Sequence, residues 1–199
     1  MDLQLANKSV LVTGSTAGIG FAIAALFAEE GAKVVVNGRS EARVKEAAEK
    51  IRRKQKNADV VEVAADLATK EGVATLTKNI SSVDVLVNNL GIYEARPFLE
   101  ITDEEWSRIF EVNVLSGVRL SRFYLPKMLK QNWGRIVFLS SESALNTPVE
   151  MIHYGVTKTA QIALARGLAE MTAGTAVTVN SILAGPTRSE GVDKFVDDM

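Results

Sequence analysis

The chain has 199 residues, of which 47% are hydrophobic and 24% are charged, and its formal net charge is −1. These proportions predict one soluble globular domain over residues 1–199. With almost no net charge and no long block of one sign, a nucleic-acid partner is not expected. The basic run at residues 52–56 instead suits the end of a helix, where it complements the dipole and stays in water.

The absence of cysteine excludes disulfides and thiolate chemistry and fits a reducing compartment. The first nine residues, MDLQLANKS, lack the apolar core of a signal peptide. The longest apolar run, residues 21–28, is too short to span a membrane. We therefore expect a cytoplasmic protein without a membrane partner, and we expect no metal site.

Short runs of β-branched residues alternate along the chain with longer helical patterns. Strands are expected at 9–13, 33–37, 59–64, 83–88, 134–140 and 176–182, and helices at 18–30, 40–55, 70–80, 103–130 and 151–172. Thr102 and Glu105 have capping-box spacing, and Gly31 and Gly174 follow helix ends. The apolar strands and the strict alternation predict an α/β fold, a doubly wound Rossmann-type parallel sheet with helices on both faces.

A glycine-rich turn, TGSTAGIG at residues 13–20, follows the first expected strand and opens the first helix. There, bare backbone amides and the helix dipole can receive a pyrophosphate. The spacing of Gly14, Gly18 and Gly20 differs from the general G-x-G-x-x-G fingerprint. Glycines that only permit a tight turn and close helix packing are therefore the alternative.

Tyr154 and Lys158 lie four residues apart in an expected helix, so their side chains share one face. A neighbouring ammonium lowers the pKa of a phenol toward the range of a general acid or base. Ser141 precedes the tyrosine by thirteen residues. A packed ring beside a solvated lysine is the alternative reading of the pair, and Ser141 could simply end a strand.

The chain resembles the classical short-chain dehydrogenase/reductase family from Lys8 to about Ser189. The matching motifs are TGSTAGIG, Asp66–Leu67, NNLG at 88–91, Asn113, Ser141 and YGVTK at 154–158. The resemblance implies that Tyr154 is the general acid/base and that Ser141 hydrogen-bonds the carbonyl oxygen. It also implies that Lys158 binds the nicotinamide ribose and lowers the tyrosine pKa, and that Asn113 holds a water in a proton relay. A helix kink at Asn113 and a capping role for Asp66 are the alternatives.

Coenzyme choice depends on charge at the end of the second strand, where an acidic residue would favour NAD. The segment has Arg39 and Ser40 there instead, which suits the 2′-phosphate, so NADP(H) is favoured over NAD(H). A solvated arginine is the alternative. The residues expected to bind the cofactor are Gly14, Ser15, Thr16, Gly18, Ile19, Gly20, Arg39, Ser40, Asp66, Leu67, Asn89, Gly91, Tyr154, Lys158, Gly185, Pro186 and Thr187.

The chain departs from the family pattern at Leu90, where alanine is usual, and at Ala184, where proline is usual. Family members continue beyond the position of Met199, and the sixth strand would otherwise be an open sheet edge. We therefore expect further residues after Met199 and a homo-oligomer, tetramer or dimer. Residues 190–199 are expected to begin a lid helix with Val192, Phe195 and Val196 on its apolar face.

The predicted function is NADP(H)-dependent interconversion of an alcohol and a ketone or aldehyde of a small-molecule substrate. A 3-oxoacyl thioester reductase is one specialisation. A catalytically degenerate dinucleotide-binding or scaffold protein is the alternative. The candidate substrate-pocket residues are Tyr93, Glu142, Leu145, Met151 and His153.

Overall fold

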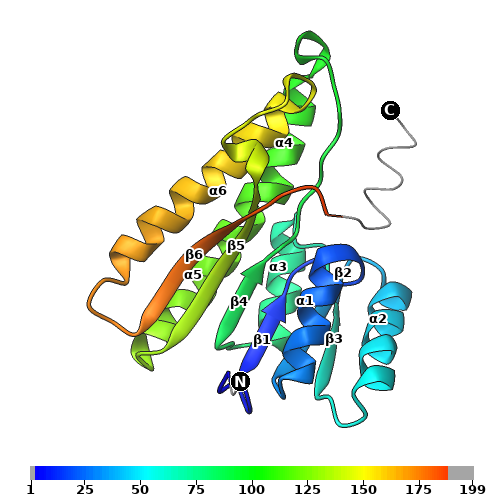
Figure 1. Cartoon of the computed structure of the whole chain (residues 1–199), viewed down its shortest axis with the longest axis vertical. Coiled ribbons are helices and arrows are strands. Elements are labelled where there is room, and N and C mark those ends of the chain that lie inside the picture. The colour runs from blue at the N-terminus through cyan, green and yellow to red at the C-terminus, as the bar shows by residue number, and fades with distance from the viewer. Residues whose placement is uncertain (1–2, 188–199) are drawn as a thin grey trace.

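A parallel sheet organises the computed structural model, which describes residues 3–187 (Figure 1). In this part of the chain the sheet has six strands in the order β3-β2-β1-β4-β5-β6. The order reverses between β1 and β4, which is the switch point of a doubly wound fold. The expected Rossmann-type fold is confirmed. The strands are β1 (Ser9–Val12), β2 (Lys33–Gly38), β3 (Val60–Ala64), β4 (Val85–Asn88), β5 (Gly134–Ser141) and β6 (Val177–Ala184).

Helices cover both faces of the sheet (Figure 1). Helices α1 (Gly18–Glu29) and α2 (Glu41–Lys54) pack on one face. Helices α3 (Lys70–Asn79), α5 (Ser116–Lys130) and α6 (Ile152–Met171) pack on the other. The expected bounds of the strands and of four helices are correct to within two residues. The short turns are η1 (Phe98–Glu100), η3 (Glu142–Ala144) and η4 (Val149–Met151).

Each face of the sheet has its own apolar cluster because successive strand side chains point to opposite faces. On β1, Val10 and Val12 pack toward α1 and α2, whereas Leu11 packs toward α3 and α5. All three side chains are fully buried. This burial on both faces explains why the strand sequences are apolar almost throughout.

The expected single helix at 103–130 is wrong in its middle. Helix α4 (Asp103–Phe110) passes into a π turn, η2 (Glu111–Leu115), before α5 begins. The capping box of Thr102 and Glu105 is confirmed at the start of α4. A π turn inserts a residue into the helix and is frequent at functional sites, and this one carries Asn113.

The two expected helix-ending glycines, Gly31 and Gly174, have φ values of +83° and +80°, which is the left-handed region that glycine favours. Strand β6 lies at one edge of the sheet in the described part of the chain, as expected. The expected lid helix at residues 190–199 lies outside the described residues.

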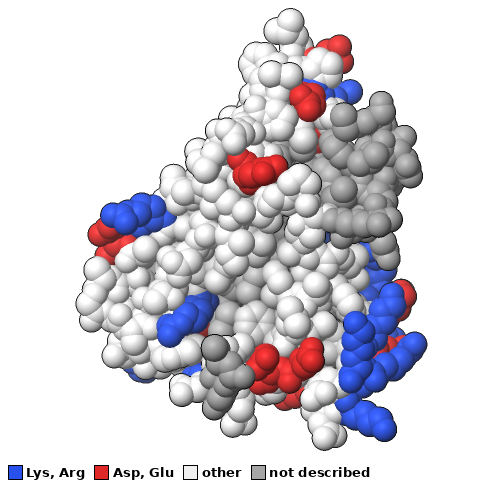
Figure 2. Space-filling model, in the orientation of Figure 1, with Lys and Arg blue, Asp and Glu red and all other residues white. Residues whose placement is uncertain are grey.

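Basic side chains gather over α2 at the lower right of the view (Figure 2). Arg52 and Arg53 in the last turn of α2 pair with carboxylates, Arg52 with Glu62 at 2.7 Å and Arg53 with Glu49 at 3.3 Å. These pairs leave a mixed, solvated surface at the helix end, as the sequence predicts. Among residues 3–187, none of the helices combines the length and apolarity needed to cross a membrane.

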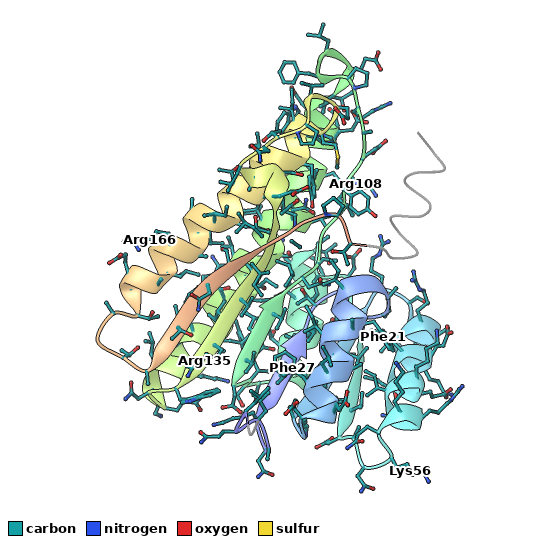
Figure 3. The ribbon with its side chains drawn as sticks, in the orientation of Figure 1. Phe21, Phe27, Lys56, Arg108, Arg135 and Arg166 are labelled. Atoms are coloured by element: carbon teal, nitrogen blue, oxygen red, sulfur yellow. The ribbon has the colours of Figure 1, made fainter. Side chains whose placement is uncertain are left out.

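Two helical glycines provide a matched test of packing. A Cβ at Gly72 would lie 1.9 Å from the carbonyl oxygen of Asp66. A Cβ at Gly167 would meet no atom within 4 Å. The preceding residue, Arg166, points away from the sheet on the outer side of α6 (Figure 3). We expect Gly72→Ala to lower the free energy of unfolding by about 1–3 kcal/mol, as overpacking does. Gly167→Ala should instead raise it by about 0.5–1 kcal/mol. Urea denaturation measures both changes, and equal stability of the two variants would contradict the packing at Gly72.

Candidate active site

A cavity of about 420 Å³ opens at the carboxyl ends of β1, β4, β5 and β6. Ligands of open α/β sheets bind at this edge because the loops diverge at the switch point. The cavity combines the glycine-rich turn, the loop after β4, the end of β5, the start of α6 and the segment after β6. Its lining includes Ala17, Gly18, Ile19, Gly20, Asn89, Gly91, Tyr93, Ser141, Glu142, Met151, Tyr154, Lys158, Gly185, Pro186 and Thr187.

Ser141, Tyr154 and Lys158, the three residues that the sequence predicts to act together, all line this cavity. Ser141 is the last residue of β5, and its hydroxyl donates to Ser143 Oγ at 3.2 Å and also interacts with the Tyr154 hydroxyl. Lys158 lies one turn along α6 from Tyr154, and its Nζ is 5.4 Å from the centre of the tyrosine ring. The side chains of a rigid strand and a rigid helix therefore converge on one point, which is how precise sites are built.

The pKa of Tyr154 is raised in this structure and not lowered, as was expected from Lys158, because the effect of burial is larger. Burial raises the pKa of the Tyr154 hydroxyl above 10.0, the hydrogen bond with Ser141 opposes the rise, and Tyr93 adds to it. The Tyr93 and Tyr154 rings meet edge to face with centroids 6.1 Å apart. The ammonium of Lys158 instead donates to the carbonyl oxygen of Leu139 at 2.7 Å. Tyr154 thus keeps its proton at neutral pH.

Lys158 is almost fully buried, with an exposed fraction of 4%. Burial lowers the pKa of its ammonium to about 8, because a charge is disfavoured where water is excluded. The Leu139 carbonyl accepts from this ammonium in place of water. A strongly shifted pKa in a cavity is a mark of functional sites.

Asn113 in the π turn fixes the loop that follows β4. Its Nδ2 donates to the Ile92 carbonyl at 2.9 Å and to Thr157 Oγ1 at 3.0 Å, and its Oδ1 accepts from the Ile92 amide at 2.8 Å. A Cβ added to Gly91 would lie 3.5 Å from both Asn113 Oδ1 and Lys158 Nζ. Asn113 therefore places Gly91 beside Lys158, and both hydrogens of its side-chain amide are used.

The glycine-rich turn is shaped by close contact with Asn89. Gly14 and Gly18 have φ values of +61° and +57°. A Cβ at Gly20 would lie 2.4 Å from Asn89 Nδ2, which donates to the carbonyls of Thr13 and Gly14 at 2.8 and 3.1 Å. The glycines thus serve both turn geometry and close packing, and the backbone at the start of α1 stays uncovered.

Ser15 points inward, away from the cavity. Its hydroxyl donates to the Val12 carbonyl at 2.7 Å and accepts from the Asn37 amide at 3.0 Å, and the side chain is fully buried. Any contact of Ser15 with a cofactor would therefore involve its backbone. Thr16 lies next to Gly38, where an added Cβ would be 2.6 Å from its methyl group.

Arg39 and Ser40 are exposed at the end of β2, near the glycine-rich turn but outside the cavity lining. Ser40 caps α2 by accepting from the Arg43 amide at 3.5 Å. Asp66, after β3, accepts from the Ala68 amide at 3.1 Å in a local turn, whereas the residue that caps α3 is Thr69. Its neighbour Leu67 is buried in the core.

Two of the expected substrate-pocket residues do not line the cavity. Leu145 is 72% exposed on the outside of the loop after η3. His153 is 3% exposed and packs against Trp106 of α4 with ring centres 6.0 Å apart. Successive side chains on a helix point in different directions, so His153 and Tyr154 face different partners. Tyr93, Glu142 and Met151 do line the cavity, as expected.

Sequence reasoning missed several residues that hold the site together. Thr13 Oγ1 accepts from the amides of Asn89 and Leu90, both at 2.9 Å. Asn37 is buried, and its Nδ2 donates to the carbonyls of Val63 in β3 and of Ala65 directly after it. Arg119 of α5 pairs with Glu111 at 2.5 Å and donates to the Ala68 carbonyl at 3.2 Å. Of these three residues, Thr13 alone could be found from the sequence, because it belongs to the glycine-rich motif.

The residues around the cavity fit a nicotinamide dinucleotide. Gly18 and Gly20 carry no side chains at the start of α1, where a helix binds a pyrophosphate. Ser141, Tyr154 and Lys158 add two hydroxyls and an ammonium to the same lining. The lining therefore combines groups that suit anion binding with groups that can exchange a proton.

Comparison with known proteins gives the same assignment. Residues 8–199 match the short chain dehydrogenase family. The chain is 46% identical to the uncharacterized oxidoreductase YvaG of Bacillus subtilis over 199 residues, covering 100% of this chain and 75% of that protein. It is 35% identical over 189 residues to the 3-oxoacyl-[acyl-carrier-protein] reductase FabG of Aquifex aeolicus, covering 93% of this chain and 76% of that protein.

A solved structure of L-sorbose reductase from Gluconobacter frateurii, complexed with NADPH and L-sorbose, superposes with a TM-score of 0.94. The two sequences are 34% identical, and the match covers 100% of this chain and 76% of that one. The chain belongs to the short chain dehydrogenase family. It is an oxidoreductase that acts on CH–OH groups with a nicotinamide dinucleotide as the second substrate.

The buried Lys158 makes stability depend on pH. Its pKa is about 8 in the folded protein and near its usual 10.5 in the unfolded chain. Between these values the unfolded state holds more protons, so raising the pH stabilises the folded state. Without dinucleotide, the free energy of unfolding of wild type should rise by roughly 2 kcal/mol relative to that of Lys158→Met between about pH 7 and about pH 9.5. Urea denaturation at both pH values measures this gain.

The matched control is Lys45→Met, which removes an exposed charge from α2. The difference in free energy of unfolding between this variant and wild type should be nearly the same at both pH values. If the difference in free energy of unfolding between wild type and Lys158→Met does not change with pH, burial of the ammonium does not reduce the stability of the protein.

Proposed function

We propose that this enzyme interconverts a ketone or aldehyde and an alcohol with NADP(H), and that Tyr154 is its general acid/base. The observation that carries the proposal is the meeting of Ser141, Tyr154 and Lys158 in a cavity that also contains the glycine-rich turn. When bound, the nicotinamide supplies or accepts the hydride. The protein supplies orientation, hydrogen bonds and the proton.

In reduction, Tyr154 transfers its hydroxyl proton to the carbonyl oxygen as the oxygen becomes an alcohol. Burial, which raises the pKa of Tyr154, supports this role because it keeps the proton on the phenol until the carbonyl oxygen gains charge. Ser141 hydrogen-bonds the same oxygen and orients the phenol. Lys158 holds the nicotinamide ribose, and its positive charge stabilises the phenolate that proton transfer leaves behind.

Two observations support NADP(H) over NAD(H). Arg39 and Ser40 are exposed at the end of β2, where the adenosine ribose of dinucleotides lies in this fold. An exposed guanidinium can contact a 2′-phosphate with two parallel hydrogen bonds. The structurally similar L-sorbose reductase was solved with NADPH. The remaining contacts are assigned to Gly14, Ser15, Thr16, Gly18, Ile19, Gly20, Asp66, Leu67, Asn89, Gly91, Gly185, Pro186 and Thr187, with those of the buried Ser15 and Leu67 made by the backbone.

The substrate is a small carbonyl compound or alcohol. The cavity presents the Tyr93 hydroxyl, the Glu142 carboxylate and the Met151 thioether, a lining in which polar groups and an apolar group are mixed. A first panel should pair a polyhydroxy ketone with a 3-oxoacyl thioester, because similar proteins carry names with these two substrate classes. By family resemblance we also propose a cytoplasmic homo-oligomer built from single-domain subunits.

Tyr154→Phe removes the proposed proton donor without removing the ring. We expect turnover to fall by about 10²-fold or more, the scale of general acid catalysis, while NADPH binding is largely kept. NADPH oxidation measured by absorbance with the best substrate of the panel gives turnover, and fluorescence titration gives binding. Tyr93→Phe is the matched control in the same cavity, and its turnover should stay within about tenfold of wild type. Near-normal turnover of Tyr154→Phe would leave the protein without its proposed acid.

Arg39→Ala tests the coenzyme assignment. Loss of a charge-assisted contact should weaken NADPH binding by about 1.5–3 kcal/mol and leave NADH binding almost unchanged. Titration of both coenzymes measures this difference. Arg53→Ala removes the same charge at the far end of α2, where Arg53 pairs with Glu49, and should affect neither coenzyme. Equal weakening of NADPH and NADH by Arg39→Ala would assign the arginine a structural role.

A further inference from the structure

Gln161 bridges the buried lysine and the π turn. It follows Lys158 by almost one turn of α6 and is 1% exposed. Its Oε1 accepts from Lys158 Nζ at 3.3 Å, and its Nε2 donates to the main-chain carbonyl of Asn113 at 2.5 Å. One neutral side chain thus connects α6 to η2 directly behind the cavity.

The bridge decides how the ammonium uses its three hydrogens. One is donated to the Leu139 carbonyl of β5 and another to Gln161, which leaves one for the cavity. A buried ammonium needs such acceptors because unpaired charge is costly where water is excluded. Gln161 therefore both stabilises the charge of Lys158 and limits the directions in which the ammonium can point.

The same bridge occupies the carbonyl of Asn113. Both hydrogens of the Asn113 side-chain amide are donated to Ile92 and Thr157, and its main-chain oxygen accepts from Gln161. An amide donates and accepts hydrogen bonds but stays neutral, so this connection holds Lys158 without passing a proton to it. Proton exchange with Lys158 would then run through the cavity.

We propose that Gln161 is a positioning residue that anchors the Lys158 ammonium to the carbonyl of Asn113 and so sets the charge and direction of that ammonium. The proposal rests on the proposed function for the role of Lys158, but the anchoring itself is independent of any substrate. No substrate atom needs to touch Gln161, which lies outside the cavity lining.

Within residues 3–187, several other groups face Lys158. On α6 itself, Tyr154 is the titratable neighbour, and Tyr93 of the loop after β4 contacts Tyr154. Strand β5 contributes the Leu139 carbonyl and the Ser140 hydroxyl, the latter donating to the Lys158 carbonyl at 2.8 Å. From η2 comes Asn113, and η3 brings the charged Glu142 to the same cavity.

The test measures the protonation of Lys158 directly. The protein is labelled with [ε-¹³C]lysine, the Lys158 signal is assigned with Lys158→Arg, and its shift is followed against pH in wild type, Gln161→Met and Gln161→Glu. The wild-type signal should titrate at about pH 8, the pKa that burial imposes on Lys158. Gln161→Met removes the acceptor and should move the midpoint down by about one pH unit. Gln161→Glu places a carboxylate beside the ammonium and should move it up by about one pH unit.

Shifts of opposite sign from two substitutions of similar size are not produced by general structural damage. The alkaline limb of the turnover profile with NADPH should move in the same directions. If Lys158 titrates with the same midpoint in wild type, Gln161→Met and Gln161→Glu, the proposed anchoring is wrong. This conclusion does not depend on the turnover of Tyr154→Phe. Near-normal turnover of Tyr154→Phe together with opposite shifts would instead overturn the proposed function alone.

If Gln161→Met does not fold, Gln161→Glu alone decides. An upward shift of the Lys158 midpoint in that variant supports the proposal, and an unchanged midpoint overturns it. If neither variant folds, a crystal structure of the wild-type holoenzyme decides. Gln161 joining Lys158 Nζ and the Asn113 carbonyl supports the proposal, and a Gln161 turned away from both overturns it.

Discussion

The buried ammonium of Lys158 is the group on which the arrangement of the site depends. It needs acceptors where water is excluded, and the fold supplies them from two different elements, the Leu139 carbonyl of β5 and the Gln161 amide of α6. Because both elements are held by the sheet and its packed helices, the ammonium has little freedom to move. Tyr154, one turn earlier on the same helix, is positioned by the same packing and by its hydrogen bond with Ser141.

The other half of the cavity depends on hydrogen bonds between strands that are distant in sequence. Thr13 and Asn89 join the ends of β1 and β4, and Asn37 joins the end of β2 to the backbone at the end of β3. These side chains satisfy backbone groups that would otherwise be buried without partners. They do not cover the backbone amides at the start of α1, where no side chain caps the helix. These amides therefore remain available to a pyrophosphate.

The sequence predicts most of this fold because its local signals agree with the tertiary structure. Alternating apolar strands and helices, the Thr102 capping box and the glycines after helices are all local features. The π turn was missed because EVNVL contains no helix breaker, and the turn is accompanied by tertiary bonds of Asn113 to Ile92 and Thr157. The pKa of Tyr154 was predicted with the wrong direction because residue spacing reveals a neighbouring charge but not the loss of water around it. The inward hydroxyl of Ser15 and the bridge made by Gln161 likewise depend on which side chains the fold brings together.

The energetics of the site favour an enzyme over a protein that only binds a dinucleotide. The glycine-rich turn, Asn89 and Thr13 shape the part of the cavity that we propose to bind the dinucleotide phosphates, and none of them carries a buried charge. Lys158 opposes stability at neutral pH, since burial lowers its pKa to about 8. Burial also raises the pKa of Tyr154, which holds back its ionisation. A scaffold gains nothing from the cost of burying Lys158, whereas proton transfer to a carbonyl oxygen needs a phenol that keeps its proton and a cation that stabilises its anion. The chain gives up stability at the place where this chemistry requires it.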